Sequence, residues 1–181
     1  MALVPLSVSA GQLTAQFEND LWGSGSDQHY THGSRFSWSS ENQLGWVQKS
    51  ARRVGGLLPW LPALDEQTLN QFEAVRFNAA IGQNIYTPED ISNPLLISDD
   101  RPYAGWLYIG SGAVLVRGAV NHRVIDSFEV NLGIVGPSSR AKQVQREFHK
   151  LIDSPDPRGW DNQLRDEPGL IVMADRQWVF P

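Results

Sequence analysis

Apolar and polar residues alternate with a period of two through most of this 181-residue chain. In the segment QLTAQFENDLW, for example, Leu13, Ala15 and Phe17 fall on one side of an extended chain and the polar residues on the other. Successive side chains of a β-strand point to opposite faces, so this pattern predicts strands with one apolar and one polar face. The chain is therefore predicted to be all-β and antiparallel, with about six strands near residues 12–22, 29–38, 69–85, 103–117, 124–135 and 170–178.

A sheet of this kind fits two classes of protein. It can be the half-buried sheet of a soluble protein, or the wall of a transmembrane barrel that is apolar outside and polar inside. The chain has 7 Trp and 4 Tyr, several of them near the expected strand ends, which favours the membrane class. The smallest bacterial outer-membrane barrels have about eight strands. Six strands therefore predict either a soluble sheet covered by a helix or the front part of a longer chain.

One segment, residues 138–152, has the periodicity of a short amphipathic helix. Gly136 and Pro137 end the preceding strand, and Ser138 is expected to cap the helix. Gln145 and His149 are four residues apart, so they lie on the same side of the helix, along the edge of its apolar stripe. That stripe, which is expected to pack against the sheet, consists of Ala141, Val144, Phe148, Leu151 and Ile152.

The composition excludes several classes of function. The net charge is −5 and the basic residues are scattered, so no cationic surface for nucleic acid is expected. The chain has no cysteine, which excludes thiol chemistry, disulfides and cysteine-ligated zinc. Oxygen and imidazole ligands remain for a metal, and calcium is the natural candidate for such ligands.

Two further segments bear on the organisation of the chain. Residues 1–10, MALVPLSVSA, are a short apolar run that ends in small residues, and they are predicted to be the remnant of an export signal or else a plain apolar terminus. Residues 11–181 then form one domain. No apolar stretch reaches the roughly 18 residues of a transmembrane helix, so any membrane crossing would use strands. Residues 42–64 contain paired prolines and are predicted to be a long connection.

Three segments together are similar to a known family. They are FENDLW followed by DQHYTHGSRFSW in residues 17–38, DDRPYAGWLYIG in residues 99–110, and GPSSRAKQVQREFHKLI followed by RGWDNQLRDEPG in residues 136–169. They resemble the LpxR-type outer-membrane lipid A 3′-O-deacylases, in the same order and over nearly the whole chain from Gln12 onward. The strings RPYAGW and GWDNQL are the most specific.

The resemblance implies an antiparallel transmembrane barrel of about twelve strands in the outer membrane of a Gram-negative bacterium. By that measure the chain is roughly the N-terminal half of the barrel. It also implies a calcium-dependent esterase site in the wall and lumen near the extracellular side. The enzyme would hydrolyse the 3′-acyloxyacyl group from the lipid A of lipopolysaccharide. A monomer surrounded by outer-membrane lipids, without nucleic acid, is expected.

The active residues of the family match five positions in this chain: Asn19, Asp20, Thr31, Gln145 and His149. Their chemistry suits ester hydrolysis, because histidine can accept a proton from water near neutral pH and a carboxylate can hold calcium. His149 would be the general base, and Asp20 would bind a calcium ion that polarises the ester carbonyl. Asn19 and Thr31 would complete the oxyanion or metal shell, and Gln145 would position substrate or water.

One position departs from the family. His32 stands where the family more often has asparagine, and because it follows Thr31 it bears on the geometry of the substrate or metal.

Structural roles are alternatives for several of these residues. Asp20 can stabilise a turn, and His149 can be a structural histidine at the border of a helix. Asp100 and Arg101 are expected to lock a turn or form an ion pair. Interfacial or packing roles are expected for Trp106 and Trp160, and a polar-loop role for Asp161, Asn162 and Glu167.

Two other functions therefore stay open beside the esterase. One is a non-catalytic outer-membrane barrel, either a passive pore or an inactive relative, in which Gln145 and His149 only fasten the helix. The other is a soluble β-rich binding protein. Calcium separates the esterase from the pore, because only the esterase should lose its activity in a chelator.

Overall fold

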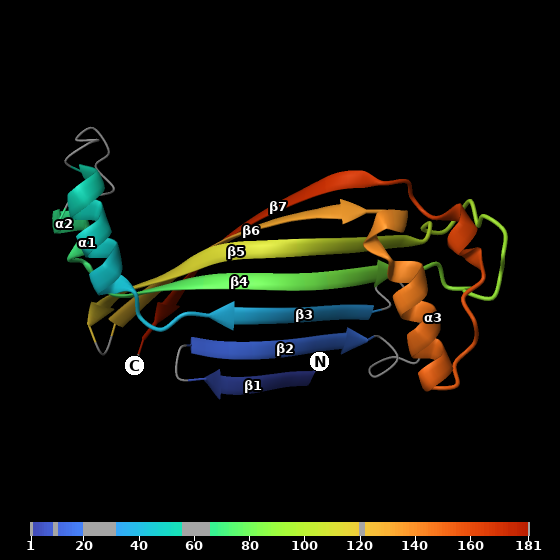
Figure 1. Cartoon of the computed structure of the whole chain (residues 1–181), viewed down its shortest axis with the longest axis horizontal. Helices are drawn as coiled ribbons and strands as arrows, with labels where there is room; N and C mark the ends of the chain where they lie inside the picture. The colour runs from blue at the N-terminus through green and yellow to red at the C-terminus, as the bar shows by residue number, and fades with distance from the viewer. Residues whose placement is uncertain (1, 9–10, 20–31, 56–65, 120–121, 181) are drawn as a thin grey trace.

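The computed structural model describes residues 2–8, 11–19, 32–55, 66–119 and 122–180. These residues form one antiparallel sheet whose strands are neighbours in the order of the chain (Figure 1). The prediction of an all-β antiparallel fold is confirmed. The strands are β1 (Ala2–Val8), β2 (Gly11–Asn19), β3 (His32–Ser39), β4 (Phe72–Tyr86), β5 (Ala104–Ala119), β6 (His122–Val135) and β7 (Glu167–Val179).

Strand β1 is the element that the sequence pattern did not predict. Its backbone pairs with β2 in an antiparallel register that runs from Ala2 opposite Phe17 to Val8 opposite Gly11. The described part of the chain therefore has seven strands, one more than the six expected. The interpretation of residues 1–10 as the remnant of an export signal stays a prediction.

The register divides the sheet into an apolar and a polar face. Phe36 on β3 pairs with Ile81 on β4, and Ile81 pairs with Ile109 on β5. Directly opposed residues share a face, and the same row continues to Leu132 and Leu170. All five side chains are more than half exposed, at 52%, 51%, 64%, 56% and 63% in that order. We call the face that carries this row the apolar face.

The opposite face, which we call the polar face, is packed with side chains. Arg35 on β3 donates two hydrogen bonds to the carboxylate of Glu129 on β6, at 2.9 and 2.7 Å, across the two strands between them. The ring of Tyr108 lies over Gly82, where a Cβ would be 2.4 Å from the ring. A glycine at this position of β4 therefore makes the room that the tyrosine fills.

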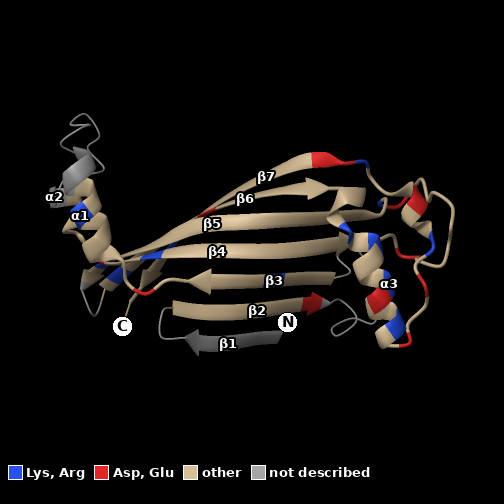
Figure 2. Ribbon diagram, in the orientation of Figure 1, with Lys and Arg blue, Asp and Glu red and all other residues tan. Residues whose placement is uncertain are grey.

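Helices lie at the two ends of the sheet, and most of the charged residues are near these ends too (Figures 1 and 2). At one end are α1 (Leu44–Gly55) and the short α2 (Glu66–Leu69). At the other end are the 3-10 turn η3 (Pro137–Ser139), helix α3 (Ala141–Leu151) and the 3-10 turn η4 (Gly159–Asn162). None of the helices in the described ranges is both long and apolar enough to cross a membrane.

Helix α1 occupies part of the segment predicted to be a long connection. Its first turn is fixed by Asn42, whose side-chain oxygen accepts a hydrogen bond from the Leu44 N–H at 3.0 Å. Trp46 then packs edge-on against Phe77 of β4, with ring centroids 6.0 Å apart. The prolines that made a regular element improbable, Pro59 and Pro62, lie outside the described residues.

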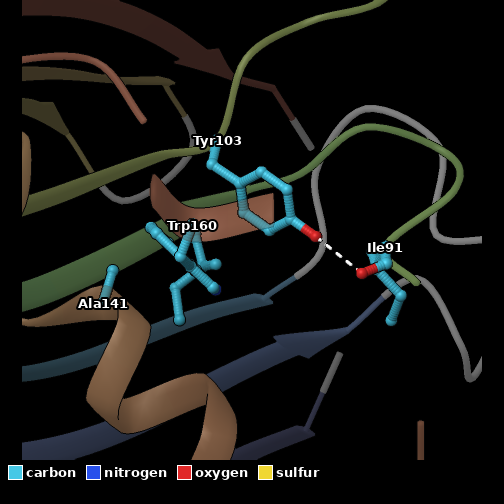
Figure 3. Close-up of a cluster of buried hydrophobic side chains, with 5 residues drawn as sticks. Ile91, Tyr103, Ala141 and Trp160 are labelled. Atoms are coloured by element: carbon cyan, nitrogen blue, oxygen red, sulfur yellow. Dashed lines mark hydrogen bonds between the residues drawn. The ribbon is translucent and has the colours of Figure 1, made fainter. Parts of the chain in front are cut away.

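A compact apolar cluster supports the end of the sheet at which α3 lies (Figure 3). The rings of Tyr103 and Trp160 are 4.8 Å apart, and Trp160 is fully buried. The Tyr103 hydroxyl donates to the Ile91 carbonyl oxygen at 3.0 Å, which joins β5 to the loop after β4. Burying each large apolar side chain contributes about 1.5–3 kcal/mol, so the cluster holds the loops around α3 in one arrangement.

Candidate active site between the sheet and helix α3

Helix α3 packs on the apolar face of the sheet. A Cβ on Gly105 of β5 would be 2.1 Å from the Cβ of Ala141, at the start of the helix. Gly105 pairs with Ile85 of β4, and both lie in register with the apolar face. Next to them, the side-chain amide of Gln83 donates to the Ser139 carbonyl oxygen at 2.6 Å. The family resemblance implied a site in the wall and lumen of a barrel; the described sheet is open, so that location stays a prediction, and the helix covers the apolar face.

The start of α3 differs from the predicted cap. The residue before the first helical turn is Arg140, which has a left-handed backbone with φ 61°, and it makes no side-chain cap. Ser138 instead bonds Asp166, just before β7: its N–H donates to one carboxylate oxygen at 2.8 Å and its hydroxyl to the other at 2.7 Å. These two bonds hold the pKa of Asp166 below its ordinary value. The serine therefore ties the helix to β7 rather than capping it.

The buried face of α3 also differs from the prediction. Gln145 and His149 are 2% and 3% exposed, whereas Val144 and Leu151 of the predicted apolar stripe are 40% and 82% exposed. The reason is that the two polar residues have specific partners in the segment that follows the helix, Trp160 for Gln145 and Pro155 for His149. The small Ala141, 1% exposed, lets the helix approach the sheet closely.

The backbone carbonyl of Pro155 determines which nitrogen of the His149 ring carries the hydrogen. The His149 Nδ1 lies 2.6 Å from this oxygen. A carbonyl oxygen can only accept, so Nδ1 carries the hydrogen, and Nε2 holds the lone pair of the neutral ring. The loop is brought back to the helix by a left-handed residue, Asp153 with φ 54°, and by the Ser154 N–H, which donates to the His149 carbonyl oxygen at 2.9 Å. The ring is thus oriented with its proton-accepting nitrogen away from Pro155.

Trp160 orients the side chain of Gln145 in a similar way. The indole Nε1 donates to the Gln145 Oε1 at 2.7 Å. Because an indole N–H is a donor only, the amide oxygen must face it and the amide nitrogen must point elsewhere. That nitrogen, Nε2, is buried and has no hydrogen-bond partner among the described residues. A buried donor without a partner is rare in native proteins and is suited to a ligand oxygen.

The ends of β2 and β3 lie beneath the same helix. Asn19, the last residue of β2, pairs with His32, the first of β3, and His32 pairs with Ile85. The His32 ring stacks on Phe148, the residue before His149, with centroids 5.4 Å apart and planes 30° apart. The backbone of Asn19 is therefore in the same row of the sheet as His32, which contacts the helix at Phe148.

The structure buries Gln145 and His149 on the same side of α3, and it places the backbone of Asn19 opposite His32, whose ring stacks on Phe148. Asp20 and Thr31 lie outside the described residues, as does the side chain of Asn19. Within the described ranges, no group of three or more His, Asp or Glu side chains could hold a metal ion. The assignment of Asp20 as a calcium ligand stays a prediction.

Two residues that support the site were not predicted in this role. Trp160 was expected to be a packing or interfacial residue, and it does pack, but it also orients Gln145. Pro155 was not singled out, because a backbone carbonyl leaves no signal in a sequence. The string GWDNQL, which carries part of the family resemblance, was the only available pointer to Trp160.

Three other predicted polar residues, Asp100, Asp161 and Asn162, act as structural ties. Asp100 locks a turn, as expected, by accepting from the N–H groups of Glu89 at 2.7 Å and Arg101 at 2.6 Å. Asp161 accepts from the Lys142 ammonium at 2.8 Å, which lowers the pKa of this aspartate, and Asn162 donates to the Pro94 carbonyl oxygen at 2.9 Å. The expected polar loop therefore fastens α3 to the segment after β4.

Comparisons with known proteins agree with this architecture. The family described as "Outer membrane protein LpxR" matches residues 2–181. Among solved structures, LpxR from Salmonella typhimurium matches with a TM-score of 0.61 and 18% sequence identity, covering 92% of this chain and 50% of that one. The chain thus spans half the length of that protein, with which it shares the fold. A search of curated proteins finds no match. Because the family matches residues 2–181, the chain belongs to the LpxR family of outer-membrane proteins.

Proposed function

We propose that this protein is an outer-membrane esterase that hydrolyses the 3′-acyloxyacyl group of lipid A, with His149 as the general base. The proposal combines the family with one observation. The His149 Nδ1 donates to the Pro155 carbonyl oxygen at 2.6 Å, so Nε2 is the nitrogen that can take a proton from water.

The reaction needs few groups. Water gives a proton to Nε2 while its oxygen forms a bond to the ester carbonyl carbon, and the carbonyl oxygen becomes an oxyanion. When the tetrahedral intermediate collapses, the bond to the alkoxide breaks and the proton on Nε2 moves to that leaving oxygen. The products are a free fatty acid and an alcohol. The buried Nε2 donor of Gln145 is suited to hold the oxyanion or the attacking water.

The location of α3 supports a lipid substrate. The helix lies on the face whose middle carries exposed side chains such as Ile81 and Ile109. In an outer-membrane protein such a face contacts lipid acyl chains. A lipid could therefore reach Gln145 and His149 from the membrane, without entering the interior of a barrel.

Calcium is part of the proposal through Asp20, with Asn19 and Thr31 as further oxygen donors. A bound calcium ion would supply positive charge next to the ester carbonyl. The residues of α3 would keep their own roles beside the ion: His149 moves the proton and Gln145 donates a hydrogen bond.

A specific observation also favours a second candidate, a non-catalytic outer-membrane protein. Gln145 and His149 each have a structural partner, Trp160 and Pro155, and these bonds could be their whole purpose.

Release of fatty acid from purified lipid A, followed by mass spectrometry, separates the two candidates. The protein reconstituted in detergent should hydrolyse lipid A, lose turnover in a chelator and regain it when calcium is added. A protein with no turnover at any calcium concentration, although correctly folded, would favour the non-catalytic candidate.

A further inference from the structure

A groove lies on the apolar face over β2, β3 and β4. Its volume is about 440 Å³. Ala15 of β2 and Ala79 of β4 give it low points, because their side chains are much shorter than those of their neighbours. The side chains that rise around them are Leu13, Phe36, Trp38 and Ile81, which are 41%, 52%, 38% and 51% exposed.

The groove is in line with the candidate active site. On β3, Phe36 and His32 share the apolar face, and on β4 the same is true of Ile81 and Ile85. The near end of the groove is therefore four residues from the row beneath α3, roughly 13 Å at about 3.3 Å per residue. Trp38 lies two residues further, about 7 Å. Strand β3 also contacts the His149 end of the helix, because His32 stacks on Phe148, and at this row β2 and β4 pair with β3 through Asn19 and Ile85.

We propose that this groove binds the acyl chain whose ester is cleaved, so that it selects long-chain substrates. The proposal rests on the proposed esterase function and adds the subsite that recognises the chain. With the ester carbonyl at Gln145 and His149, the chain runs along the strands past Phe36 and ends near Trp38. The lining of the groove is nearly all apolar, so it can pack against the methylene groups of an acyl chain.

Ordinary membrane lipid is the competing occupant. Lipid chains cover the whole apolar face of an outer-membrane protein, and they would fill a depression on it as readily as any other part. They would not, however, make turnover depend on the shape of this depression. Filling the groove therefore distinguishes the two occupants.

The variant Ala79→Phe fills the low point on β4 while it keeps the face apolar. The matched control is Ala174→Phe on β7, opposite Phe128 in the same sheet and outside the groove. The substrates are lipid A molecules whose 3′-acyl chains differ in length. For the longest chain, Ala79→Phe should lower kcat/KM at least tenfold. For the shortest chain, the decrease should be the smallest. Ala174→Phe should match the unmodified protein at every length. If Ala79→Phe had the same kcat/KM as the unmodified protein at every chain length, the proposal would be overturned.

A second measurement does not need turnover. Lipid A with a photoreactive diazirine at the end of its 3′-acyl chain is bound to His149→Asn protein and illuminated, and the labelled residues are identified by mass spectrometry. Labels should concentrate at Phe36, Trp38 and Ile81. If labels were spread evenly over these residues and the similarly exposed Ile109 and Leu132, the proposal that the groove binds the acyl chain would be overturned. This holds whether or not the unmodified protein is an esterase. If the labels were concentrated in the groove but the unmodified protein did not hydrolyse lipid A, only the proposed esterase function would be overturned.

Discussion

The indole N–H of Trp160 donates to the side-chain oxygen of Gln145 over 2.7 Å, and this one bond determines which way the glutamine amide points. Trp160 is itself fully buried against Tyr103, within the cluster that fixes the loops around α3. The orientation of a polar group on the helix is therefore set by the packing of a residue 15 positions further along the chain.

Replacing this tryptophan should lower both activity and stability. In Trp160→Phe the Gln145 oxygen loses its donor, and a buried acceptor without a partner costs about 1–3 kcal/mol of unfolding free energy. Because the amide can then turn, kcat should fall by up to about 10²-fold with a smaller change in KM. Lipid A hydrolysis and urea unfolding check both effects. Trp178→Phe is the control, because Trp178 is 60% exposed on β7. If Trp160→Phe and Trp178→Phe lost equal amounts of activity and stability, the proposed role of Trp160 would be contradicted.

The close approach of α3 to the sheet gives a second prediction. In Gly105→Ala the new methyl would be 2.1 Å from the Cβ of Ala141, so the helix must move away from β5. Overpacking of this kind costs about 1–3 kcal/mol, and the shift of Gln145 and His149 should lower turnover as well. Gly45→Ala is the matched control, since a Cβ there meets nothing within 4 Å. Unchanged turnover in Gly105→Ala would show that the helix tolerates displacement.

The strands could be predicted because their signal is local. The alternation around Ile81 and Phe36 needs no knowledge of other strands. Strand β1 was missed because an apolar run at the start of a chain also fits an export signal, and it contains Pro5, a residue that strands disfavour.

The candidate site could be predicted only in part. Gln145 and His149 were identified through the family, but they were expected at the edge of the apolar stripe that includes Val144 and Leu151, and the structure instead buries them fully. The buried face of the helix is decided by Trp160 and Pro155, whose contacts with the helix arise only in the folded chain. Periodicity measures how apolar a face is and carries no information about hydrogen-bond partners beneath it.

The bonds between Ser138 and Asp166 predict a pH dependence at the start of α3. The pKa of Asp166 is lowered by the two hydrogen bonds from Ser138, so the stabilisation is present above the unfolded pKa of about 4 and is lost as pH falls through the lower folded value. Hydrogen exchange of the Ser138 amide should therefore show protection near pH 5 that disappears in stronger acid. In Asp166→Ala the protection should be low throughout. Protection that is equal in both proteins would contradict the role of this carboxylate.

The proposed calcium ligand gives a prediction that differs in kind from those on α3. Asp20→Asn replaces an anionic oxygen ligand with a neutral one, so the calcium concentration needed for half-maximal hydrolysis should rise. Turnover at saturating calcium should recover at least in part, because the base and the Gln145 donor are unchanged. A calcium titration of lipid A hydrolysis measures this. An unchanged calcium requirement would remove Asp20 from the metal site.

His149→Asn is the most direct test of the base. Asparagine is polar and of similar size, so the helix should keep its position, while the nitrogen that accepts the proton is gone. Loss of a general base typically lowers the rate by about 10²–10⁴-fold, and added calcium should not restore it. Lys150→Asn is a matched control on the next residue, which is exposed and donates a hydrogen bond to Glu147 at 2.7 Å. Near-normal turnover of folded His149→Asn, or rescue by calcium, would leave His149 with the structural role that its bond to Pro155 already provides. Circular dichroism and heat-modifiable migration in gels establish that the variant is folded before its rate is compared.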